Sequence, residues 1–280
     1  MRLTRRNERL LKLASVATLA FIYLPLLVIL VYAFSASTTQ VWPPDGLTTK
    51  WFGEAFDNSG ARDAFLLSLE AAAFATTVAI VLGTLASMAV ARYRFFGRET
   101  ISFLVILPIA LPGIVTGVAL NTSFTQILGV ELSLFTIVVG HATFCIVVVY
   151  NNVVARMRRV GGSLEEASAD LGADTWQTFR LVTLPSLRSA MLAGALLAFA
   201  LSFDEIIVTT FTAGAEETLP IWIFTNIARP NQLPIVNVVG LTVIVLSIIP
   251  VYLANRLSQD PIGTRAGAAP AGGAAAAAAR

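Results

Sequence analysis

EEASADLGADTWQTFRLVTLP, residues 165 to 185, is the most polar stretch between the first and last long apolar runs of this chain. The sequence around it is unusually apolar: 56% of the 280 residues are hydrophobic and 13% are charged, and the mean hydropathy is +0.76. Ordinary soluble domains carry about 25% charged residues. The chain is therefore predicted to be a membrane protein, and the polar stretch needs a reason of its own.

Six apolar runs surround or follow this stretch. A run of about 18 or more residues can cross the hydrocarbon core of a bilayer. Five runs are free of charge, and a sixth, residues 190–213, carries only Asp204 and Glu205. The five are residues 13–34, 71–91, 101–130, 132–155 and 232–255. We expect an all-α integral membrane fold with six transmembrane helices over residues 13–257, and the polar loop 157–188 between the fourth and fifth.

The distribution of positive charge predicts the orientation. Of the 19 Lys and Arg residues, 16 fall before the first run, after the last, or in the loops between runs two and three and between runs four and five. Lys50, Arg62 and Arg229 fall on the other side. Because basic residues concentrate on the cytoplasmic side, both termini are expected in the cytoplasm, with residues 1–12 as the N-terminal segment. The first apolar run is also longer than the hydrophobic core of a signal peptide, which is the competing interpretation.

Other features of the sequence favour packing or exclude function classes. Pro108 and Pro112 should kink or break the third span, and Gly113 and Gly117 form a GxxxG pattern that lets another helix approach closely. The alternative interpretation is that the kink itself acts as a gate. The single histidine, His141, is expected to be a packed neutral side chain rather than a metal ligand or a proton carrier. Cys145 is the only cysteine, so no internal disulfide can form.

Nucleotide and nucleic-acid binding are not predicted. Lys12 and Lys50, the only lysines, do not follow the glycine of a phosphate-binding loop, and a net charge of +2 is too small to indicate a nucleic-acid partner. We expect no catalytic residue, cofactor or metal site in this chain, so ATP, if it is used, must be bound by another protein. Residues 258–280 are of low complexity, rich in Ala and Gly, and are expected to be a disordered cytoplasmic tail.

The polar stretch is predicted to form two short helices. Ser163 and Glu166 have the spacing of a capping box that starts the first. Gly172 is suited to the left-handed conformation that ends it. Asp174 with Gln177 can start the second helix, which Pro185 closes or redirects.

Such short helices are unstable alone in water and need a partner. The apolar side of the first should consist of Leu164, Ala167, Ser168 and Leu171. A hairpin folded back on the bundle or on the membrane surface is the simpler alternative. The acidic Glu165, Glu166 and Asp170 argue against anionic lipid, so we interpret the hairpin as a docking site for a soluble protein.

At this point the sequence resembles a known family. Glu166-Ala167-Ser168, then three residues, Gly172, nine residues and Val182-Thr183-Leu184-Pro185 are similar to the EAA signature of ABC importer permeases, with Ser168 and Val182 as departures. The resemblance implies that the loop is a coupling helix seated on a cytoplasmic ATPase. Its implied coupling residues are Glu165, Glu166, Ala167, Gly172, Leu184 and Pro185.

A second resemblance concerns the solute. SFDEIIVTTFTAG at 202–214, TLPIWIF at 218–224 and the P-x-x-N-V-V of 234–239 resemble the second permease of bacterial spermidine/putrescine-type importers. The implied assembly contains two ABC ATPase subunits, a second permease subunit as a heterodimer partner, and an extracytoplasmic substrate-binding protein. The implied location is the bacterial inner membrane, in contact with the lipid bilayer.

The two membrane acids are the candidate substrate path. An acidic residue at the centre of a span costs about 2.5 to 3.5 kcal/mol on insertion scales. Helical geometry separates the two acids, because Glu205 shares a polar stripe with Ser202, Thr209 and Thr212, whereas Asp204 lines up with apolar residues. Glu205 is then the stronger candidate, and Asp204 contacts a neighbouring helix or the second permease. A purely structural role for the pair is the alternative.

These observations favour one function over two others. We expect a non-enzymatic permease subunit of an ATP-driven importer that moves a small charged solute, a polyamine first among them, by alternating access. Another small solute is the nearest alternative. An ion-coupled secondary transporter with Asp204 and Glu205 as its relay leaves the hairpin unexplained, and a non-transporting scaffold or sensor leaves the membrane acids unexplained.

Overall fold

The computed structural model describes residues 5–258, which are helical apart from connecting loops and an isolated bridge between Ser35 and Leu47. The elements are α1 (Arg5–Ala33), α2 (Lys50–Asp57), α3 (Ser59–Arg92), α4 (Arg98–Ala110), α5 (Gly113–Thr122), η1 (Ser123–Ile127), α6 (Leu134–Val160), α7 (Ser163–Asp170), α8 (Thr175–Thr178), η2 (Phe179–Thr183), α9 (Leu184–Phe203), α10 (Ile207–Thr212), α11 (Leu219–Asn226) and α12 (Leu233–Ser258). The short elements η1 and η2 are π-helical turns.

Several of these helices are suited to a membrane. Within residues 5–258, four helical segments are long and apolar enough to cross one: α1, α3, α6 and the unbroken helical run Thr175–Phe203. A fifth is obtained if α4 and α5–η1, which meet at 104°, count as one broken span, and α12 adds a shorter apolar stretch, Leu233–Ile248. The predicted all-α membrane fold is therefore confirmed in its class.

The centre of the molecule is formed by α3, α6 and α9, which pack side by side. The buried side of α3 consists largely of small residues, among them Ala71, Ala75, Ala79 and Gly83. A Cβ atom on Gly83 would lie 3.0 Å from the Ile146 carbonyl oxygen of α6. Small side chains thus let the backbones approach closely, which is how helices associate where lipid removes the hydrophobic driving force between them.

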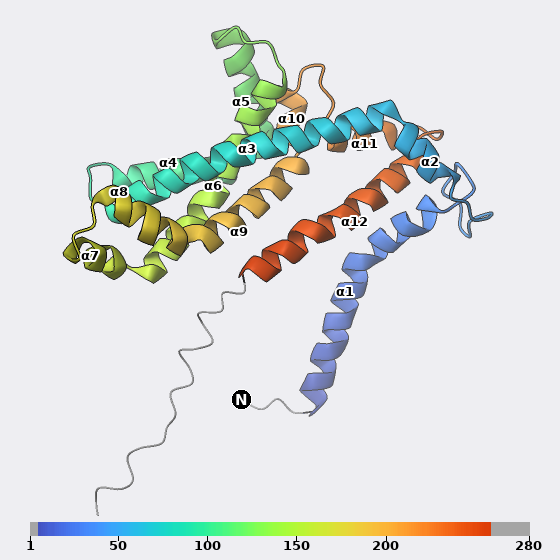
Figure 1. The fold of residues 1–280 in the computed structure, drawn as a ribbon. Helices are drawn as coiled ribbons and strands as arrows, with labels where there is room; N and C mark the ends of the chain where they lie inside the picture. The colour runs from blue at the N-terminus through green and yellow to red at the C-terminus, as the bar shows by residue number, and fades with distance from the viewer. Residues whose placement is uncertain (1–4, 259–280) are drawn as a thin grey trace, which may run out of the picture.

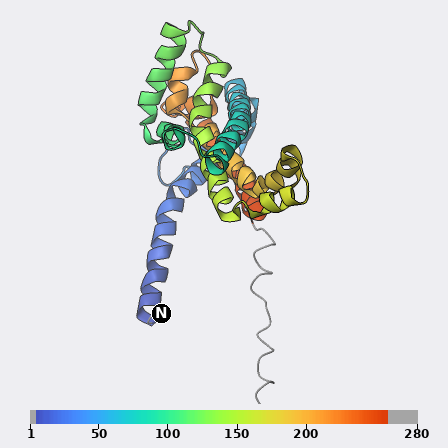
Figure 2. The same cartoon turned by 90° about the vertical axis from the view of Figure 1, so that its left-hand side faces the viewer.

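The first helix stands apart from this centre. Both views show α1 diverging from the other helices along most of its length (Figures 1 and 2), and none of its most apolar window is buried. Its main contact is with α12, where a Cβ on Gly240 would lie 3.8 Å from Ile29. Pro25 lies inside α1 without ending it.

Two expected spans are interrupted. The third breaks between Ala110 and Gly113, so the predicted effect of proline is confirmed at Pro112, whereas Pro108 stays inside α4. The fifth, expected as one helix over residues 190–213, instead ends at Phe203, and the chain continues as the separate helix α10. The expectation of a continuous fifth span is therefore wrong.

The two ends of the chain differ in how far the structure covers them. Helix α1 already begins at Arg5, so the described part of the expected N-terminal segment, residues 5–12, extends the first span. The expected tail, residues 258–280, lies outside the described residues except for Ser258, the last residue of α12.

The long helix α3 separates the two ends of the bundle. The pair α7 and α8 lies near its Arg92 end, and α2 lies at its Ser59 end (Figure 1). The polar hairpin and the loop before α2 are thus about one long helix apart, which at 34 residues corresponds to roughly 50 Å.

Candidate functional site

The first arm of the hairpin begins where predicted, but by a different cap. Helix α7 starts at Ser163, and the carbonyl oxygen of Gly162 accepts hydrogen bonds of 3.0 Å from the N–H groups of both Glu165 and Glu166. No side-chain cap is present, because Ser163 is already the first helical residue and not the residue before it. The predicted capping box between Ser163 and Glu166 is therefore wrong.

The end of this arm agrees with the prediction. Gly172 has a φ of +86°, its N–H donates to the Ala169 carbonyl oxygen at 2.9 Å, and the N–H of Ala173 donates to that of Ser168 at 3.1 Å. This pair of bonds is the Schellman motif, which satisfies the last carbonyl groups of a helix. A Cβ on Gly172 would meet no atom within 4 Å. Glycine is therefore required here by backbone conformation and not by lack of space.

The second arm is also partly as predicted. The Asp174 side chain accepts from the Gln177 N–H at 2.8 Å, and the Gln177 side chain accepts from the Asp174 N–H at 3.0 Å, so this capping box is confirmed. Pro185, however, lies in the first turn of α9, where its missing N–H is tolerated. It begins α9 rather than ending the second arm, which runs through η2 into α9 without a break.

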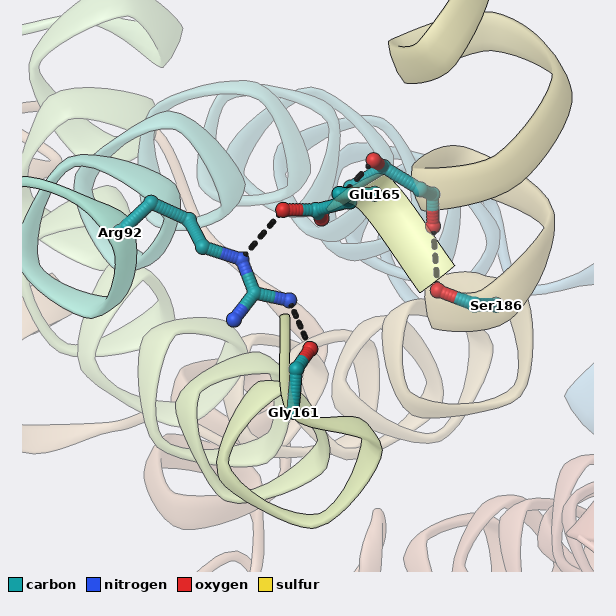
Figure 3. A network of polar contacts seen from close by, with 5 residues as sticks. Arg92, Gly161, Glu165 and Ser186 are labelled. Atoms are coloured by element: carbon teal, nitrogen blue, oxygen red, sulfur yellow. Dashed lines mark hydrogen bonds and ion pairs between the residues drawn. The ribbon is translucent and has the colours of Figure 1, made fainter. Parts of the chain in front are cut away.

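A polar network of four residues fastens the hairpin to the bundle. Arg92, the last residue of α3, places its Nε 2.8 Å from Oε2 of Glu165, and its Nη2 donates to the Gly161 carbonyl oxygen at 2.6 Å. Figure 3 shows the guanidinium group between these two acceptors. The other carboxylate oxygen of Glu165 accepts from the Thr183 hydroxyl at 2.9 Å. One carboxylate therefore joins α7 to α3 and to η2.

The network continues into α9 and α6. The Ser186 hydroxyl donates to the Thr183 carbonyl oxygen at 2.7 Å, and Ser186 lies beyond Glu165 in Figure 3. The Ser186 carbonyl oxygen accepts from Nε of Arg156 at 3.0 Å. Sequence reasoning used Arg92 and Arg156 only as markers of orientation. Their partners, Gly161 and Ser186, lie 69 and 30 residues away in the sequence, so these contacts become visible only in the folded structure.

The remaining hairpin residues are mostly exposed. Leu164, Leu171, Trp176 and Leu181 are 52%, 89%, 66% and 70% exposed, and Glu166 and Ala167 are exposed as well. Ser168, expected on the same side as Leu164, is instead half-buried, and its hydroxyl contacts that of Thr178 at 3.0 Å. The hairpin thus presents apolar side chains next to carboxylates with no covering segment among residues 5–258.

Leu184 and Pro185 lie at the base of the hairpin. Together with Ile80, Met191 and Leu192 they line an apolar hollow of about 400 Å³ between α3 and α9. They are therefore separated from the exposed residues of α7 and belong to the junction with the bundle.

The acidic pair in the membrane segment lies at the break between α9 and α10. Asp204 is the residue after the last turn of α9 and is exposed, and its carboxylate has no hydrogen bond or ion pair within residues 5–258. Glu205 is half-buried, and its Oε1 accepts from the N–H of Val208 at 2.9 Å. Glu205 thereby caps α10, since the first N–H groups of a helix lack intrahelical partners. The stripe argument that separated the two acids assumed a continuous helix and loses its basis.

The hydroxyl groups of Ser202 and Thr209 are hydrogen-bonded to the single histidine. His141 is 1% exposed, its Nδ1 lies 2.7 Å from the Ser202 hydroxyl, and its Nε2 lies 2.8 Å from the Thr209 hydroxyl. Because the Thr209 hydroxyl donates to the Glu205 carbonyl oxygen at 2.8 Å, it must accept from Nε2–H. The Ser202 hydroxyl can donate to Nδ1 of a neutral ring, so both ring nitrogens have partners. His141 is therefore packed within the chain, as expected, and it joins α6 to both sides of the break.

The short helix α10 is also held by α5. A Cβ on Gly117 would lie 2.6 Å from the Phe211 ring, and a Cβ on Gly113 would lie 3.4 Å from Ile207. The Asn121 amide donates to the Phe211 carbonyl oxygen at 2.7 Å. The predicted close approach of a helix to the GxxxG pattern is confirmed, with α10 as the approaching helix.

A further polar feature, missed from the sequence, lies toward the Ser59 end of α3. A hollow of about 360 Å³ is lined by four carboxylates, Asp63, Glu70, Glu216 and Glu217, and by no basic residue. Asp63 and Glu70 lie two turns apart on α3, and the other two lie just before α11. Each acid is unremarkable by itself in the sequence, and only the fold brings them together.

Comparisons with known proteins give a consistent result. Residues 79–261 match the family described as binding-protein-dependent transport system inner membrane component. The chain is 32% identical over 254 residues to the putrescine transport system permease protein PotI of Escherichia coli (strain K12), covering 86% of this chain and 89% of that protein. It is 30% identical over 242 residues to the spermidine/putrescine transport system permease protein PotC of Haemophilus influenzae, covering 86% and 93%.

A solved structure shares the fold. A chain of a bacterial ABC transporter involved in the import of the acidic polysaccharide alginate superimposes with a TM-score of 0.67, covering 92% of this chain and 99% of that one, at 19% sequence identity.

Proposed function

The chain belongs to the family of binding-protein-dependent transport system inner membrane components, and from this premise we propose that it is the permease subunit through which an ATP-driven importer moves a polyamine. As a member of this family it is a multi-pass inner-membrane transport subunit of an ABC importer and not an enzyme. The nature of the solute, the topology and the roles of single residues form the proposal.

The acidic hollow carries the assignment of the solute class. Its four carboxylates outnumber the one nearby cation, Arg62, whose Nε lies 4.0 Å from Asp63, and the remaining negative charge attracts a cation and repels an anion. The relatives PotI and PotC are named for putrescine and spermidine, both of which are cationic amines. A polyamine of the spermidine/putrescine class fits both observations better than a neutral or anionic solute.

The topology that we propose has six spans and both termini in the cytoplasm. Besides the distribution of basic residues, it is supported by the position of the hairpin and of α2 at opposite ends of α3 (Figure 1). The six-span domain extends over residues 13–257. The hairpin then faces the cytoplasm, and the acidic hollow faces outward, where an extracytoplasmic substrate-binding protein delivers the solute.

This topology can be tested with single cysteines. Ser59 and Ser163 are both exposed, whereas the native Cys145 is buried and does not compete for the reagent. In intact cells an impermeant thiol reagent should modify a cysteine at position 59 and not one at position 163. The reverse pattern of modification would contradict the orientation.

The hairpin is proposed to dock on an ABC ATPase subunit. Its exposed apolar residues, Leu164, Leu171 and Trp176 above all, provide the area that a docking contact buries, and Glu166 and Ala167 lie among them. Gly172 fixes the end of the docking helix, Glu165 fixes its base, and Leu184 with Pro185 joins it to the bundle. Two such ATPase subunits and a second permease subunit complete the assembly, which works by alternating access.

The break between α9 and α10 is proposed as part of the substrate path. Asp204 is exposed there and able to accept hydrogen bonds from an ammonium group, with the half-buried Glu205 next to it. Ser202 and Thr209, occupied by His141, support the break and do not line the path in this conformation.

The decisive experiment uses the reconstituted assembly. Permease pair, ATPase and binding protein are placed in proteoliposomes, and uptake of radiolabelled putrescine and spermidine is measured with and without ATP. We expect uptake that requires ATP and ATPase activity that rises with polyamine-loaded binding protein. Uptake driven by an ion gradient without ATP would favour a secondary transporter. ATP-driven uptake of a neutral or anionic solute alone would refute the polyamine assignment and retain the permease.

A further inference from the structure

We propose that Arg92 is the positioning residue that makes the docking hairpin and the central helices move as one unit. The proposal rests on the docking function given above and adds a specific linkage to it. Arg92 does not touch the solute or the nucleotide. Its role is to transmit the displacement of α7 to α3.

Apart from this network, α7 is held by a side-chain contact between the Ser168 and Thr178 hydroxyls at 3.0 Å. None of its eight residues, all of which the structure describes, is buried. A helix of this length is not stable by itself in water. The preceding Gly161 has a φ of +70°, and a Cβ there would meet no atom within 4 Å. The turn between α6 and α7 therefore lacks packing that would resist bending, and polar contacts must fix its angle.

Arg92 supplies two of these contacts across that turn. Its guanidinium group contacts the carbonyl oxygen of Gly161 before α7 and the carboxylate of Glu165 in the first turn of α7 (Figure 3). The guanidinium group hydrogen-bonds the Gly161 carbonyl oxygen through Nη2, while its Nε forms a close ion pair with Glu165 without hydrogen-bond alignment. A single guanidinium group thus contacts both sides of the turn, which the compact ammonium group of a lysine would do less well. Only about a quarter of each side chain of the ion pair is exposed, 23% for Arg92 and 25% for Glu165, so water screens the contact less than at the surface.

Glu165 connects the same point to the other side of the hairpin. Its second oxygen accepts from Thr183, which is 5% exposed and lies in the π-helical turn directly before α9. A force on α7 is thus passed through one carboxylate to α3 and to the start of α9. These are two of the three central helices.

A charge-reversal experiment tests the linkage in the complete assembly. Arg92→Glu and Glu165→Arg each place like charges together, and the double variant restores an ion pair of opposite orientation. We expect each single variant to lower uptake per assembled complex about tenfold, within the range of about 5- to 150-fold typical of coupling between sites. The double variant should recover in part, to more uptake than the product of the two single losses, as expected for directly interacting residues. Recovery stays incomplete because a carboxylate at position 92 cannot donate to the Gly161 carbonyl oxygen.

The control is another ion pair of the same chain. Lys12 and Glu8 lie 2.7 Å apart on α1, with side chains 74% and 55% exposed. The same reversals there should leave uptake per complex unchanged, because an exposed pair on a helix surface contributes little. Additive losses at Arg92 and Glu165, with no recovery in the double variant, would overturn the proposal.

A second readout is independent of the solute. Spin labels at Ala169 of α7 and Leu85 of α3, both exposed, report the distance between the two elements in the complex with and without nucleotide. We expect a narrow distribution that nucleotide does not change, and a broader, nucleotide-dependent one for Arg92→Gln.

The outcomes of the two tests are separable. Failure of polyamine uptake in the unmodified assembly refutes the proposed solute and leaves the distance measurement intact. Identical distance distributions in the unmodified protein and in the Arg92→Gln variant refute the linkage. If the charge-reversed chains do not assemble, the Arg92→Gln variant still tests the linkage through the distance measurement.

Discussion

Two pairs of adjacent carboxylates, Glu165–Glu166 in the hairpin and Asp204–Glu205 at the break between α9 and α10, use their members in the same way. In each pair one carboxylate is bound within the chain and the other is exposed. Glu165 is held by Arg92 and Thr183, and Glu205 by the N–H of Val208. Glu166 and Asp204 are exposed. The two bound carboxylates differ in their partners. Glu165 joins helices that are distant in sequence, whereas Glu205 binds a backbone N–H three residues ahead.

The difference follows from the surroundings. At the hairpin, a charged side chain from another helix compensates the carboxylate, and this contact fixes two elements that are distant in sequence. At the break, within residues 5–258 no basic side chain pairs with Glu205, and its partner lies three residues ahead. An ion pair is expensive to remove from water, whereas a backbone N–H at a helix start is already polar and unpaired. The chain therefore uses an ion pair to join helices that are distant in sequence and a backbone N–H to bind the carboxylate within one turn.

The largest expected effect is at the exposed acid of the break. Asp204→Asn should lower polyamine uptake per assembled complex by about ten- to a hundredfold, since a hydrogen bond to a charged group contributes about 1.5 to 3 kcal/mol. Asp204→Glu keeps the charge and should retain most of the activity. Equal uptake by the Asn and Glu variants would show that the exposed acid of this pair does not meet the solute.

The next effect is at the end of the docking helix. Gly172→Val should weaken co-purification of the ATPase about tenfold, because the left-handed conformation costs a non-glycine residue about 1 to 2 kcal/mol or more. Gly172→Asn is the matched control, since asparagine tolerates this conformation better. The open space around the Cβ position excludes a steric clash as the cause. If Val and Asn behave alike, the geometry of the hairpin does not depend on this φ angle.

A smaller effect is expected at the bound acid of the break. Glu205→Leu removes the acceptor of the Val208 N–H and should destabilise the complex by about 1 kcal/mol, as the loss of a helix cap does. Glu205→Gln keeps an oxygen that can accept the same bond and should unfold at the temperature of the unmodified complex. Thermal unfolding in detergent distinguishes them. If the Gln variant is as unstable as the Leu variant, the charge of Glu205 matters and the comparison between the two pairs fails.

The smallest effect is expected at the exposed acid of the hairpin. Glu166→Gln should change the stability of the isolated permease by less than about 0.5 kcal/mol, as for most surface substitutions. Any weakening of ATPase binding should be a few-fold at low ionic strength and disappear at about 1 M salt, where exposed charges are screened. Titration of ATPase against the permease at two salt concentrations measures both. A loss that persists at high salt would place Glu166 in a buried contact and not in an exposed one.

The sequence predicted most features that depend on neighbouring residues; the exception is the Ser163–Glu166 capping box, because the helix begins one residue earlier than expected, with Gly162 at its N-cap. Gly172, the Asp174–Gln177 box and the break at Pro112 follow from local backbone chemistry, and all three are present. Hydropathy predicted the class of the fold in the same way, because spans need only length and apolar composition.

What could not be predicted depends on contacts between distant residues. Arg92 and Glu165 are 73 positions apart, and His141 is bonded to residues 61 and 68 positions away. The break at Asp204 belongs to the same class. Residues 190–213 are apolar enough for one helix, and only the fold, with α10 packed against α5 and bonded to His141, favours two. The continuous-helix assumption behind the ranking of the two membrane acids is therefore not met.

The isolation of α1 has a consequence for the order in which the protein is built. Its main neighbour within the described chain is α12, and about 200 residues separate the end of one helix from the start of the other. At about 5 to 20 residues per second, the ribosome needs roughly 10 to 40 s to make that segment. During this time α1 must remain in the bilayer by its own hydrophobicity, which is consistent with the absence of charged residues from 13 to 33. Helix α12, the last span to be synthesised, is thus the one that packs against α1, the first.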